Sequence, residues 1–178
     1  KFILCTGQLQ RRKNVIPLIE AYASLPQKVR EVYKLVFAGT SKDPVYTALI
    51  KDCLLKLGLS NNVKLLGRVE TALLRKLYST TSCFVYPSLF EGFGLPPLEA
   101  MQCGAPVVCS LASSLPEVCG DAALLVDPND VGALATAINR VITDGTLQQD
   151  LSFKGLARAK QFSWINAAKE TYAVYKSS

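Results

Sequence analysis

Two glutamates, Glu91 and Glu99, lie eight positions apart in the stretch EGFGLPPLEAMQCG, on either side of a Gly-Phe-Gly and a Pro-Pro. A carboxylate accepts hydrogen bonds from hydroxyls, and one carboxylate can serve two neighbouring hydroxyls at once. The backbone between the two acids carries two glycines, so little side-chain bulk would keep a ligand away from it. The spacing therefore predicts a site where two hydroxyl-bearing groups are held on either side of exposed main chain.

The prolines in this stretch predict where a helix begins. Because the first turn of a helix has unpaired N–H groups in any case, proline is tolerated there, and Pro96 and Pro97 place the helix start near Leu95. The prolines offer no donor, so the amides of residues 93–95 are the free ones, at the positive end of the helix dipole. Such amides bind phosphate. An acid, bare amides and a second acid, in this order, match a sugar, a diphosphate and a ribose, as in a sugar nucleotide.

A purely structural interpretation of the two acids is the alternative. Glu99 would then only complement the helix dipole, and Glu91 would be a surface loop residue.

Strand-like and helix-like segments alternate along the whole chain, and these elements must position the acids. Continuously apolar runs predict strands at 2–7, 34–39, 63–67, 83–88, 106–110 and 123–127, and helical spacing predicts helices at 14–25, 44–57, 71–78, 131–143, 147–161 and 164–176, besides the one that starts near Leu95. Apolar strands each followed by a helix indicate a parallel sheet buried on both faces. We therefore expect an α/β, doubly wound, single Rossmann-like domain, with ligands at the carboxyl ends of the strands.

Several smaller expectations concern the helices. Asn14 is expected to cap the helix that follows it, and Asp130 the helix at 131–143. Trp164, Tyr172 and Tyr175 form an aromatic stripe that we expect to pack.

Length and composition limit the classes of function. The 178 residues suffice for one well-buried domain, and 49% of them are hydrophobic. No apolar run reaches the roughly 18 residues of a transmembrane segment, and no signal-peptide pattern is present. Six cysteines without a CxxC pair favour reduced thiols and a cytoplasmic location, with disulfides in an oxidising compartment as the alternative. For the full-length protein, a location at the membrane surface also stays open.

The net charge of +6 suggests an anionic partner. The chain has one run of three basic residues, Arg11-Arg12-Lys13, and no aromatic residues alternate with them. We therefore expect a small phosphorylated ligand and no nucleic acid. The chain lacks G-x-G-x-x-G and the P-loop motif, so an NAD-type dinucleotide site and a P-loop NTPase are not supported. It also lacks G-x-S-x-G and has no histidine, so a Ser-His-Asp hydrolase is not supported either. With no D-x-D pair and no zinc-ligand spacing, we expect no metal and no cofactor, and anion binding must use amides, Arg and Lys.

Three motifs in order, GQLQRRKN, EGFGLPPLEAMQCGAPVV and SSLPEVCGDAALLVDPND, resemble the donor-binding, C-terminal half of the GT-B glycosyltransferases, specifically glycosyltransferase family four. The resemblance covers essentially the whole chain. It implies catalytic roles for the residues that would contact the diphosphate and the donor sugar: Arg12, Lys13 and Glu91. It implies substrate binding by the residues that would make room for the donor, give it amides, or line its ribose and base: Gly7, Arg68, Val69, Gly92, Phe93, Gly94, Leu95 and Glu99.

One position departs from the family pattern. Many members carry an arginine directly after the first-turn glycine, where this chain has Gln8. We assign the guanidinium role to Arg12, with Arg11 as the substitute; a solvated cluster at the start of the helix is the structural alternative for this triplet. Ser114 to Glu117 would either line the donor pocket or form a structural loop.

The resemblance also implies a reaction and a missing partner. The expected reaction is retaining, metal-independent transfer of a sugar from a UDP- or GDP-linked donor to an acceptor hydroxyl. A GT-B enzyme has two such domains, so an N-terminal acceptor domain would be absent here, and the chain alone would bind nucleotide with little or no transferase activity. The alternatives are a GT-B sugar-nucleotide epimerase or phosphorylase, and a non-catalytic nucleotide-sugar-binding module.

Overall fold

A six-stranded, entirely parallel sheet forms the centre of the molecule. The computed structural model describes residues 1–177, and its strands are β1 (Phe2–Thr6), β2 (Lys34–Ala38), β3 (Val63–Leu65), β4 (Cys83–Tyr86), β5 (Val107–Ser110) and β6 (Ala123–Val126). Their order in the sheet is β3-β2-β1-β4-β5-β6, and every neighbouring pair is parallel. This is the doubly wound order, so the predicted fold class is confirmed.

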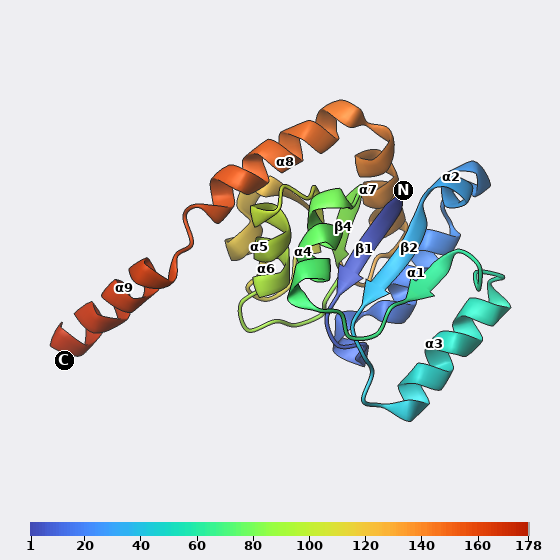
Figure 1. The fold of residues 1–178 in the computed structure, drawn as a ribbon, viewed down its shortest axis with the longest axis horizontal. Coiled ribbons are helices and arrows are strands. Elements are labelled where there is room, and N and C mark those ends of the chain that lie inside the picture. Colours follow the sequence, from blue (N-terminus) through green and yellow to red (C-terminus); the bar gives the residue numbers. More distant parts are fainter. Residues whose placement is uncertain (178) are drawn as a thin grey trace.

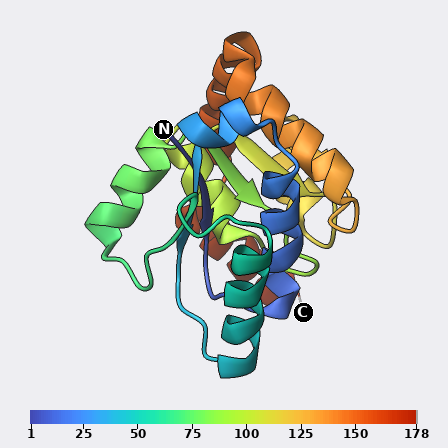
Figure 2. The same cartoon turned by 90° about the vertical axis from the view of Figure 1, so that its right-hand side faces the viewer.

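Helices cover both faces of the sheet (Figures 1 and 2). They are α1 (Val15–Ala23), α2 (Gln27–Val32), α3 (Pro44–Lys56), α4 (Thr71–Thr80), α5 (Leu95–Gln102), α6 (Leu115–Cys119), α7 (Val131–Thr143), α8 (Gly145–Ala159) and α9 (Trp164–Ser177), with short 3₁₀ turns η1 (Arg11–Lys13) and η2 (Gly120–Ala122). The helices α1, α3 and α7 contribute to the core on one face, and α4, α5 and α6 to the core on the other. In Figure 1, α4 and α5 lie in front of the strands.

The central strands are mostly apolar because each face of the sheet has its own core. In β1, Ile3 and Cys5 belong to the core beneath α1 and α7, whereas Leu4 between them belongs to the core beneath α4 and α5. Successive side chains of a strand point to opposite faces, so a strand buried on both sides favours apolar residues at successive positions. Because these two cores use the side chains of the strands, the residues available to a ligand lie in the loops at the strand ends.

The order of the strands reverses direction between β1 and β4. The chain winds outward from β1 through β2 to β3, then returns to place β4 on the other side of β1. In sheets of this order, the loops after β1 and β4 leave in opposite directions, and ligands bind at the carboxyl edge between them. The motif GQLQRRKN follows β1, and the stretch with Glu91 and Glu99 follows β4.

The sequence-based elements agree with the structure, with local differences. Each predicted strand occurs within two residues of its expected ends, and the helix at 131–143 has the expected bounds. The helix α2 is new. Asp130 caps α7 as expected, accepting from the amide of Ala133 at 2.8 Å. Asn14 occupies the N-cap position of α1, but its side chain makes no capping bond and donates to the carbonyl oxygen of Pro128 at 2.6 Å, so the predicted cap is wrong in its chemistry.

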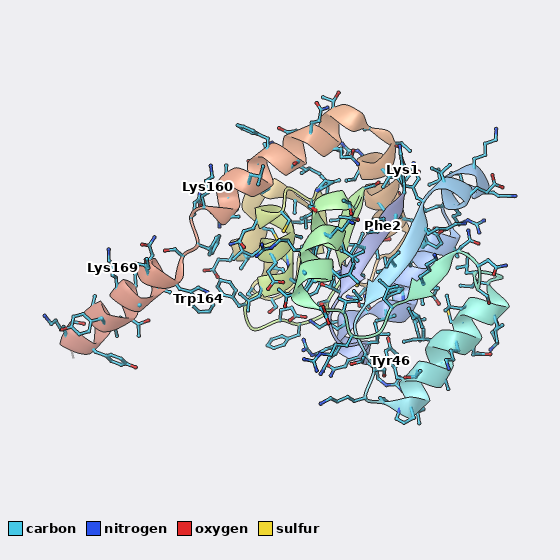
Figure 3. All side chains as sticks on the ribbon, viewed as in Figure 1. Lys1, Phe2, Tyr46, Lys160, Trp164 and Lys169 are labelled. Carbon is cyan, nitrogen blue, oxygen red and sulfur yellow. The ribbon has the colours of Figure 1, made fainter. Side chains whose placement is uncertain are left out.

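The last helix, α9, extends away from the body of the molecule (Figures 1 and 3). None of its described residues is buried. Trp164, Tyr172 and Tyr175 are 82%, 60% and 76% exposed, so this stripe is not buried within residues 1–177, and the expectation that it packs stays a prediction for a surface outside them. Among the helices formed by residues 1–177, none combines the length and the apolar character that crossing a membrane requires.

Candidate functional site

The helix α5 begins as the two prolines predict, and the amides at its start have no hydrogen-bond acceptor among the described residues. Gly94 is the N-cap residue, with φ of 113°, a left-handed conformation that favours glycine. A Cβ at Gly94 would also lie 2.8 Å from Cδ2 of Leu115. Among the hydrogen bonds of the described residues, none uses the amide of Phe93, Gly94 or Leu95 as donor. The start of α5 thus offers three unpaired N–H groups, as an anion site requires.

Two serines hold the loop that leads into α5. The hydroxyl of Ser113 donates to the carbonyl oxygen of Glu91, and the hydroxyl of Ser114 donates to the carbonyl oxygens of Glu91 and Phe93 at 3.0 and 2.7 Å. Ser113 has φ of 59°, an unusual conformation for a residue with a side chain. These contacts use the carbonyl oxygens of Glu91 and Phe93, and the amide of Glu91 donates to Oγ of Ser113 at 3.3 Å, whereas the amides of residues 93–95 stay without a partner among the described residues. Ser114 therefore supports the loop into α5, and residues 115–117 lie in the helix α6; a role of residues 114–117 in lining a donor pocket stays a prediction.

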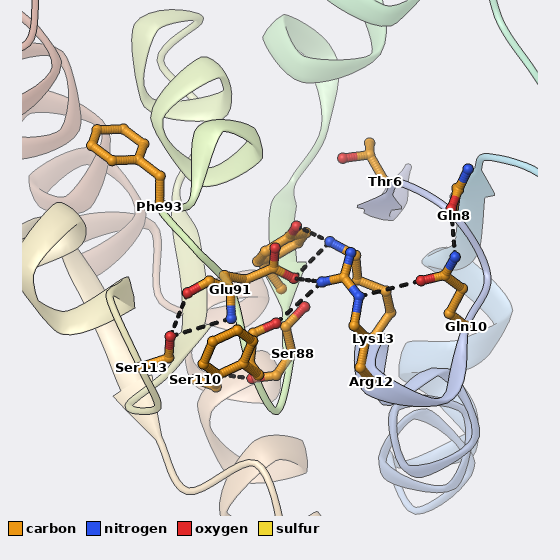
Figure 4. Close-up of polar contacts among 12 residues, drawn as sticks. Thr6, Gln8, Gln10, Arg12, Lys13, Ser88, Glu91, Phe93, Ser110 and Ser113 are labelled. Carbon is orange, nitrogen blue, oxygen red and sulfur yellow. Dashed lines mark hydrogen bonds and ion pairs between the residues drawn. The ribbon is translucent and has the colours of Figure 1, made fainter.

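A cluster of charges lies beside the start of α5 (Figure 4). One carboxylate oxygen of Glu91, Oε1, accepts from Nζ of Lys13 at 2.6 Å and from Nη1 of Arg12 at 3.0 Å. The Lys13 ammonium also donates to the hydroxyl of Tyr86, the last residue of β4, and lies 4.6 Å from the centre of the Tyr86 ring. The side chains of Lys13 and Glu91 are each 10% exposed and that of Arg12 is 47% exposed. The cluster is therefore a buried pair with one cation at the surface.

The protonation of Glu91 follows from two opposing effects. Burial alone would raise the pKa of its carboxyl, but the hydrogen bond and charge of Lys13 and the charge of Arg12 outweigh burial, and the pKa lies below the ordinary value of 4.5. For Tyr86, burial and then the nearby charge of Glu91 raise the pKa of the phenol, so it stays protonated at neutral pH. The cluster at neutral pH thus holds two cations and one anion, a net charge of about +1.

The structure separates the two candidate arginines. Arg12 faces Glu91 and also donates to the carbonyl oxygen of Phe90 at 3.1 Å, and its Nε donates to Gln10 at 3.2 Å. The guanidinium of Arg11 instead lies 5.3 Å from the ring centre of Tyr46, on α3. Arg12 is therefore the guanidinium that lies beside the start of α5.

A second group of predicted residues lines a cavity of about 290 Å³ at the same edge of the sheet. Its walls include Gly7 and Gln8 after β1, Arg68 and Val69 after β3, and Glu99 on α5. Thr6, Ala38, Gly39, Thr40, Leu74, Tyr78 and Pro96 complete it. The exposed side chain of Glu99 accepts from the hydroxyl of Tyr78 at 3.2 Å, which leaves its other carboxylate oxygen without a partner among the described residues.

Gly7 connects the cavity with the charged cluster. It has φ of 108°, and a Cβ there would lie 3.7 Å from Cε and Nζ of Lys13. The loops after β1 and β2 also approach closely, because a Cβ at Gly39 would lie 1.8 Å from the carbonyl oxygen of Gly7. Gly7 therefore lines the cavity and also lies beside Lys13 of the charged cluster.

Some site residues could not be found from the sequence. Tyr78, Tyr86 and Ser113 gave no signal, because each resembles an ordinary core or loop residue until the fold brings it against a charged partner. Among residues 1–177, no group of three or more His, Cys, Asp or Glu side chains comes together as a set of metal ligands.

Fold and site together define a Rossmann-like domain with unpaired amides, a cluster of charged side chains and an exposed acid at the switch point of its sheet. A sequence model of the family described as "Glycosyl transferases group 1" matches residues 1–158. The chain belongs to this family.

Individual relatives agree with this membership. The O-antigen chain mannosyltransferase B of Escherichia coli is 43% identical over 178 residues, which are 98% of this chain and 45% of that protein. Among solved structures, the sucrose-phosphate synthase of Thermosynechococcus elongatus matches with a TM-score of 0.87 and 31% identity, over 99% of this chain and 45% of the other. Anabaena Alr3699/HepE in complex with UDP matches with a TM-score of 0.89 and 26% identity, over 99% and 49%. This chain thus spans about half the length of these proteins.

Proposed function

We propose that this chain is the donor-binding half of a glycosyltransferase that uses a nucleoside diphosphate sugar. The observation that carries the proposal is the set of unpaired amides at residues 93–95, which follow Glu91 of the charged cluster in the chain and precede Pro96 and Glu99 of the cavity wall. A diphosphate at these amides has cations on one side and a space for a nucleoside on the other. The UDP complex of a structure with the same fold, Alr3699/HepE, supports the class of ligand.

The placement of the donor follows from the chemistry of each wall. The diphosphate meets the amides at the start of α5, with Lys13 and Arg12 beside it. The ribose enters the cavity, where the unpaired oxygen of Glu99 accepts from its hydroxyls. The base lies against Arg68 and Val69 at the far wall. The sugar lies on the other side of the diphosphate, within reach of Glu91.

The proposed reaction breaks the bond between the anomeric carbon and the diphosphate oxygen and forms a bond from that carbon to an acceptor hydroxyl. Negative charge grows on the departing diphosphate, and groups that are already in place stabilise it most effectively. This stabilisation comes from the amides at the start of α5 and from the side chains of Lys13 and Arg12. The proposed reaction uses no metal. In the proposed step the acceptor hydroxyl attacks the anomeric carbon from the face that the diphosphate leaves, and its proton passes to the departing phosphate. Attack on this face retains the anomeric configuration and needs no side chain as nucleophile.

The donor sugar is proposed from a relative. Because a 43% identical protein is a mannosyltransferase, we propose a mannosyl donor, with UDP and GDP both to be tested as the nucleotide. The remaining half of the enzyme, an N-terminal domain that binds the acceptor, is proposed from the lengths of the relatives, of which this chain covers 45% in the first case.

Calorimetric titration with UDP, GDP and ADP and with their sugars tests the binding step. We expect one nucleoside diphosphate to bind and Glu99→Ala to weaken it by about 1 to 3 kcal/mol, since the ribose hydroxyls lose a charged acceptor. Glu20→Ala, which removes an exposed acid on α1, is the matched control and should leave binding unchanged. If no nucleoside diphosphate binds the unmodified chain, the proposal is wrong.

A non-catalytic binding module and a sugar-nucleotide epimerase are the competing functions. An epimerase would be expected to use histidine, and these 178 residues contain none. Transfer by the full-length protein, measured with Lys13→Ala and with the exposed Lys51→Ala as control, separates an enzyme from a module. We expect Lys13→Ala to abolish transfer and Lys51→Ala to leave it unchanged. A full-length protein that binds donor but shows neither transfer nor hydrolysis would favour the module.

A further inference from the structure

A buried tyrosine joins the end of β1 to the acid in the cavity. The hydroxyl of Tyr78, on α4, lies 3.0 Å from Oγ1 of Thr6 and 3.2 Å from Oε2 of Glu99. All three side chains line the same cavity of about 290 Å³. They come from three elements, β1, α4 and α5, so the contact exists only in the folded domain.

The direction of the hydrogen bonds follows from the number of protons. A phenol has one proton, and a carboxylate is the stronger acceptor, so Tyr78 donates to Glu99 and accepts from the hydroxyl of Thr6. Burial, the largest cause, and the charge of Glu99 raise the pKa of Tyr78, so its phenol stays protonated and remains a donor at neutral pH. The chain of donation thus runs from Thr6 through Tyr78 to Glu99.

The tyrosine is held rigidly, whereas the glutamate is not. Tyr78 is 3% exposed, and its ring lies edge-on against Phe84 of β4 with 5.3 Å between ring centres. Glu99 is exposed, and a free glutamate loses rotamer freedom when it binds a ligand. A fixed donor on one carboxylate oxygen removes part of that loss before the ligand arrives and aims the other oxygen into the cavity.

We propose that Tyr78, aligned by Thr6, is a positioning residue that presents the Glu99 carboxylate to the two neighbouring hydroxyls of the donor ribose. The inference rests on the proposed function, because it needs a nucleoside in the cavity. Tyr78 acts through Glu99, so its contribution depends on the hydroxyls of the ribose and on the presence of Glu99. A residue that only stabilised the domain would show neither dependence.

The test compares Tyr78→Phe with the unmodified chain by calorimetric titration, using GDP and UDP and their 2′,3′-dideoxy analogues. We expect the substitution to weaken the ribonucleotide about 5- to 20-fold and the dideoxy analogue less than about 2-fold. Tyr22→Phe is the matched control: Tyr22 is also buried and also donates through its hydroxyl, to the carbonyl oxygen of Tyr33 at 2.7 Å, but it lies in the core on the other face. It should leave both affinities unchanged.

Two further variants keep the result interpretable. In a Glu99→Ala background, Tyr78→Phe should add less than about a 2-fold effect, because the group it positions is gone. Thr6→Val, which keeps the shape of the side chain, should weaken the ribonucleotide in the same direction and by a smaller factor. Thermal unfolding of every variant shows whether the domain is intact.

The outcomes separate the two proposals. If the unmodified chain binds no nucleoside diphosphate, the proposed function fails. If it binds and prefers the ribonucleotide, but Tyr78→Phe leaves that preference unchanged, the positioning role is wrong while the proposed function stands. Equal weakening of ribonucleotide and dideoxy analogue, or full additivity with Glu99→Ala, would also overturn the positioning role.

Discussion

Glu91 is a buried carboxylate whose charge depends on its two cationic neighbours. Removing a charge from water is costly, and a buried ion is tolerated when it is paired and hydrogen-bonded. Lys13 at 2.6 Å and Arg12 at 3.0 Å meet this condition through a single oxygen, Oε1. The same two cations are those proposed to face the donor diphosphate, so Glu91 keeps them in place before any ligand is bound.

The lowered pKa of Glu91 makes stability depend on pH in a defined direction. A depressed pKa contributes stability that is complete above the unfolded value, 4.5, and is lost as the pH falls through the folded value. We expect Glu91→Gln to lower the free energy of unfolding by about 1 to 3 kcal/mol at pH 7, because it leaves Lys13 buried without an anion. Urea titrations from pH 7 to pH 3 measure this difference.

The difference between the variant and the unmodified chain should be constant above about pH 5 and shrink below it, since Glu91 itself then becomes protonated. Glu20→Gln, at an exposed position of α1, is the control and should show no such pH dependence. A Glu91→Gln difference that stayed the same down to pH 3 would contradict the assignment of a charged Glu91.

In most contacts of the site, the sequence alone identified one of the two partners and not the other. The two acids, the Arg-Lys pair and the glycines stand out because their types and spacing are unusual for a core. Their partners Tyr78 and Tyr86 do not stand out, because an apolar helix face and a buried strand end both favour tyrosine for packing. Only the placement of α4 and β4 beside β1 turns their hydroxyls toward Glu99 and Lys13.

Among the elements, the loop into α5 contains two glycines with different physical reasons to be glycine. Gly94 has φ of 113° and no room for a Cβ, whereas a Cβ at Gly92 would meet nothing within 4 Å. We expect Gly94→Ala to destabilise the domain by about 1 to 3 kcal/mol through backbone strain and the clash with Leu115. Gly92→Ala should change stability by less than about 0.5 kcal/mol.

Binding separates the same two variants in a second way. If the diphosphate occupies the space in front of Gly92, Gly92→Ala should weaken nucleoside diphosphate binding although the domain is as stable as before. Thermal unfolding and calorimetric titration of both variants measure the two effects. Undiminished binding by Gly92→Ala would place the ligand away from this loop.

The elements that the sequence did not reveal share a physical cause. The helix α2 has no buried residue, so it leaves no apolar periodicity to detect. The side chain of Asn14 was expected to cap α1, but the preceding 3₁₀ turn gives Asn14 a left-handed backbone, with φ of 57°, and its amide reaches Pro128 in the loop before α7. Local rules predicted the strands and long helices because those are decided by burial, and failed where a contact distant in sequence decides.

At the scale of the whole molecule, we propose that the site is one half of a crevice between two domains. The proposed ligand groups all come from the carboxyl edge of one sheet, and nothing among them is proposed to hold an acceptor. The helix α9 leaves the body with large apolar side chains exposed, Trp164 and Tyr175 among them. Together with the 45% coverage of the first relative, this supports a complete enzyme with a second domain across the crevice.

The last prediction concerns the isolated chain. Its donor site needs only residues within 178 positions, so we expect it to bind the nucleoside diphosphate with the dependence on Glu99 described above. Transfer needs an acceptor held against the anomeric carbon, and loss of that positioning costs several orders of magnitude in rate. We therefore expect transfer below detection for the chain alone and turnover once an N-terminal half is restored, measured as sugar transferred to an acceptor. Lys13→Ala in the restored enzyme measures the background transfer. Full turnover by the chain alone would show that transfer does not need a second half.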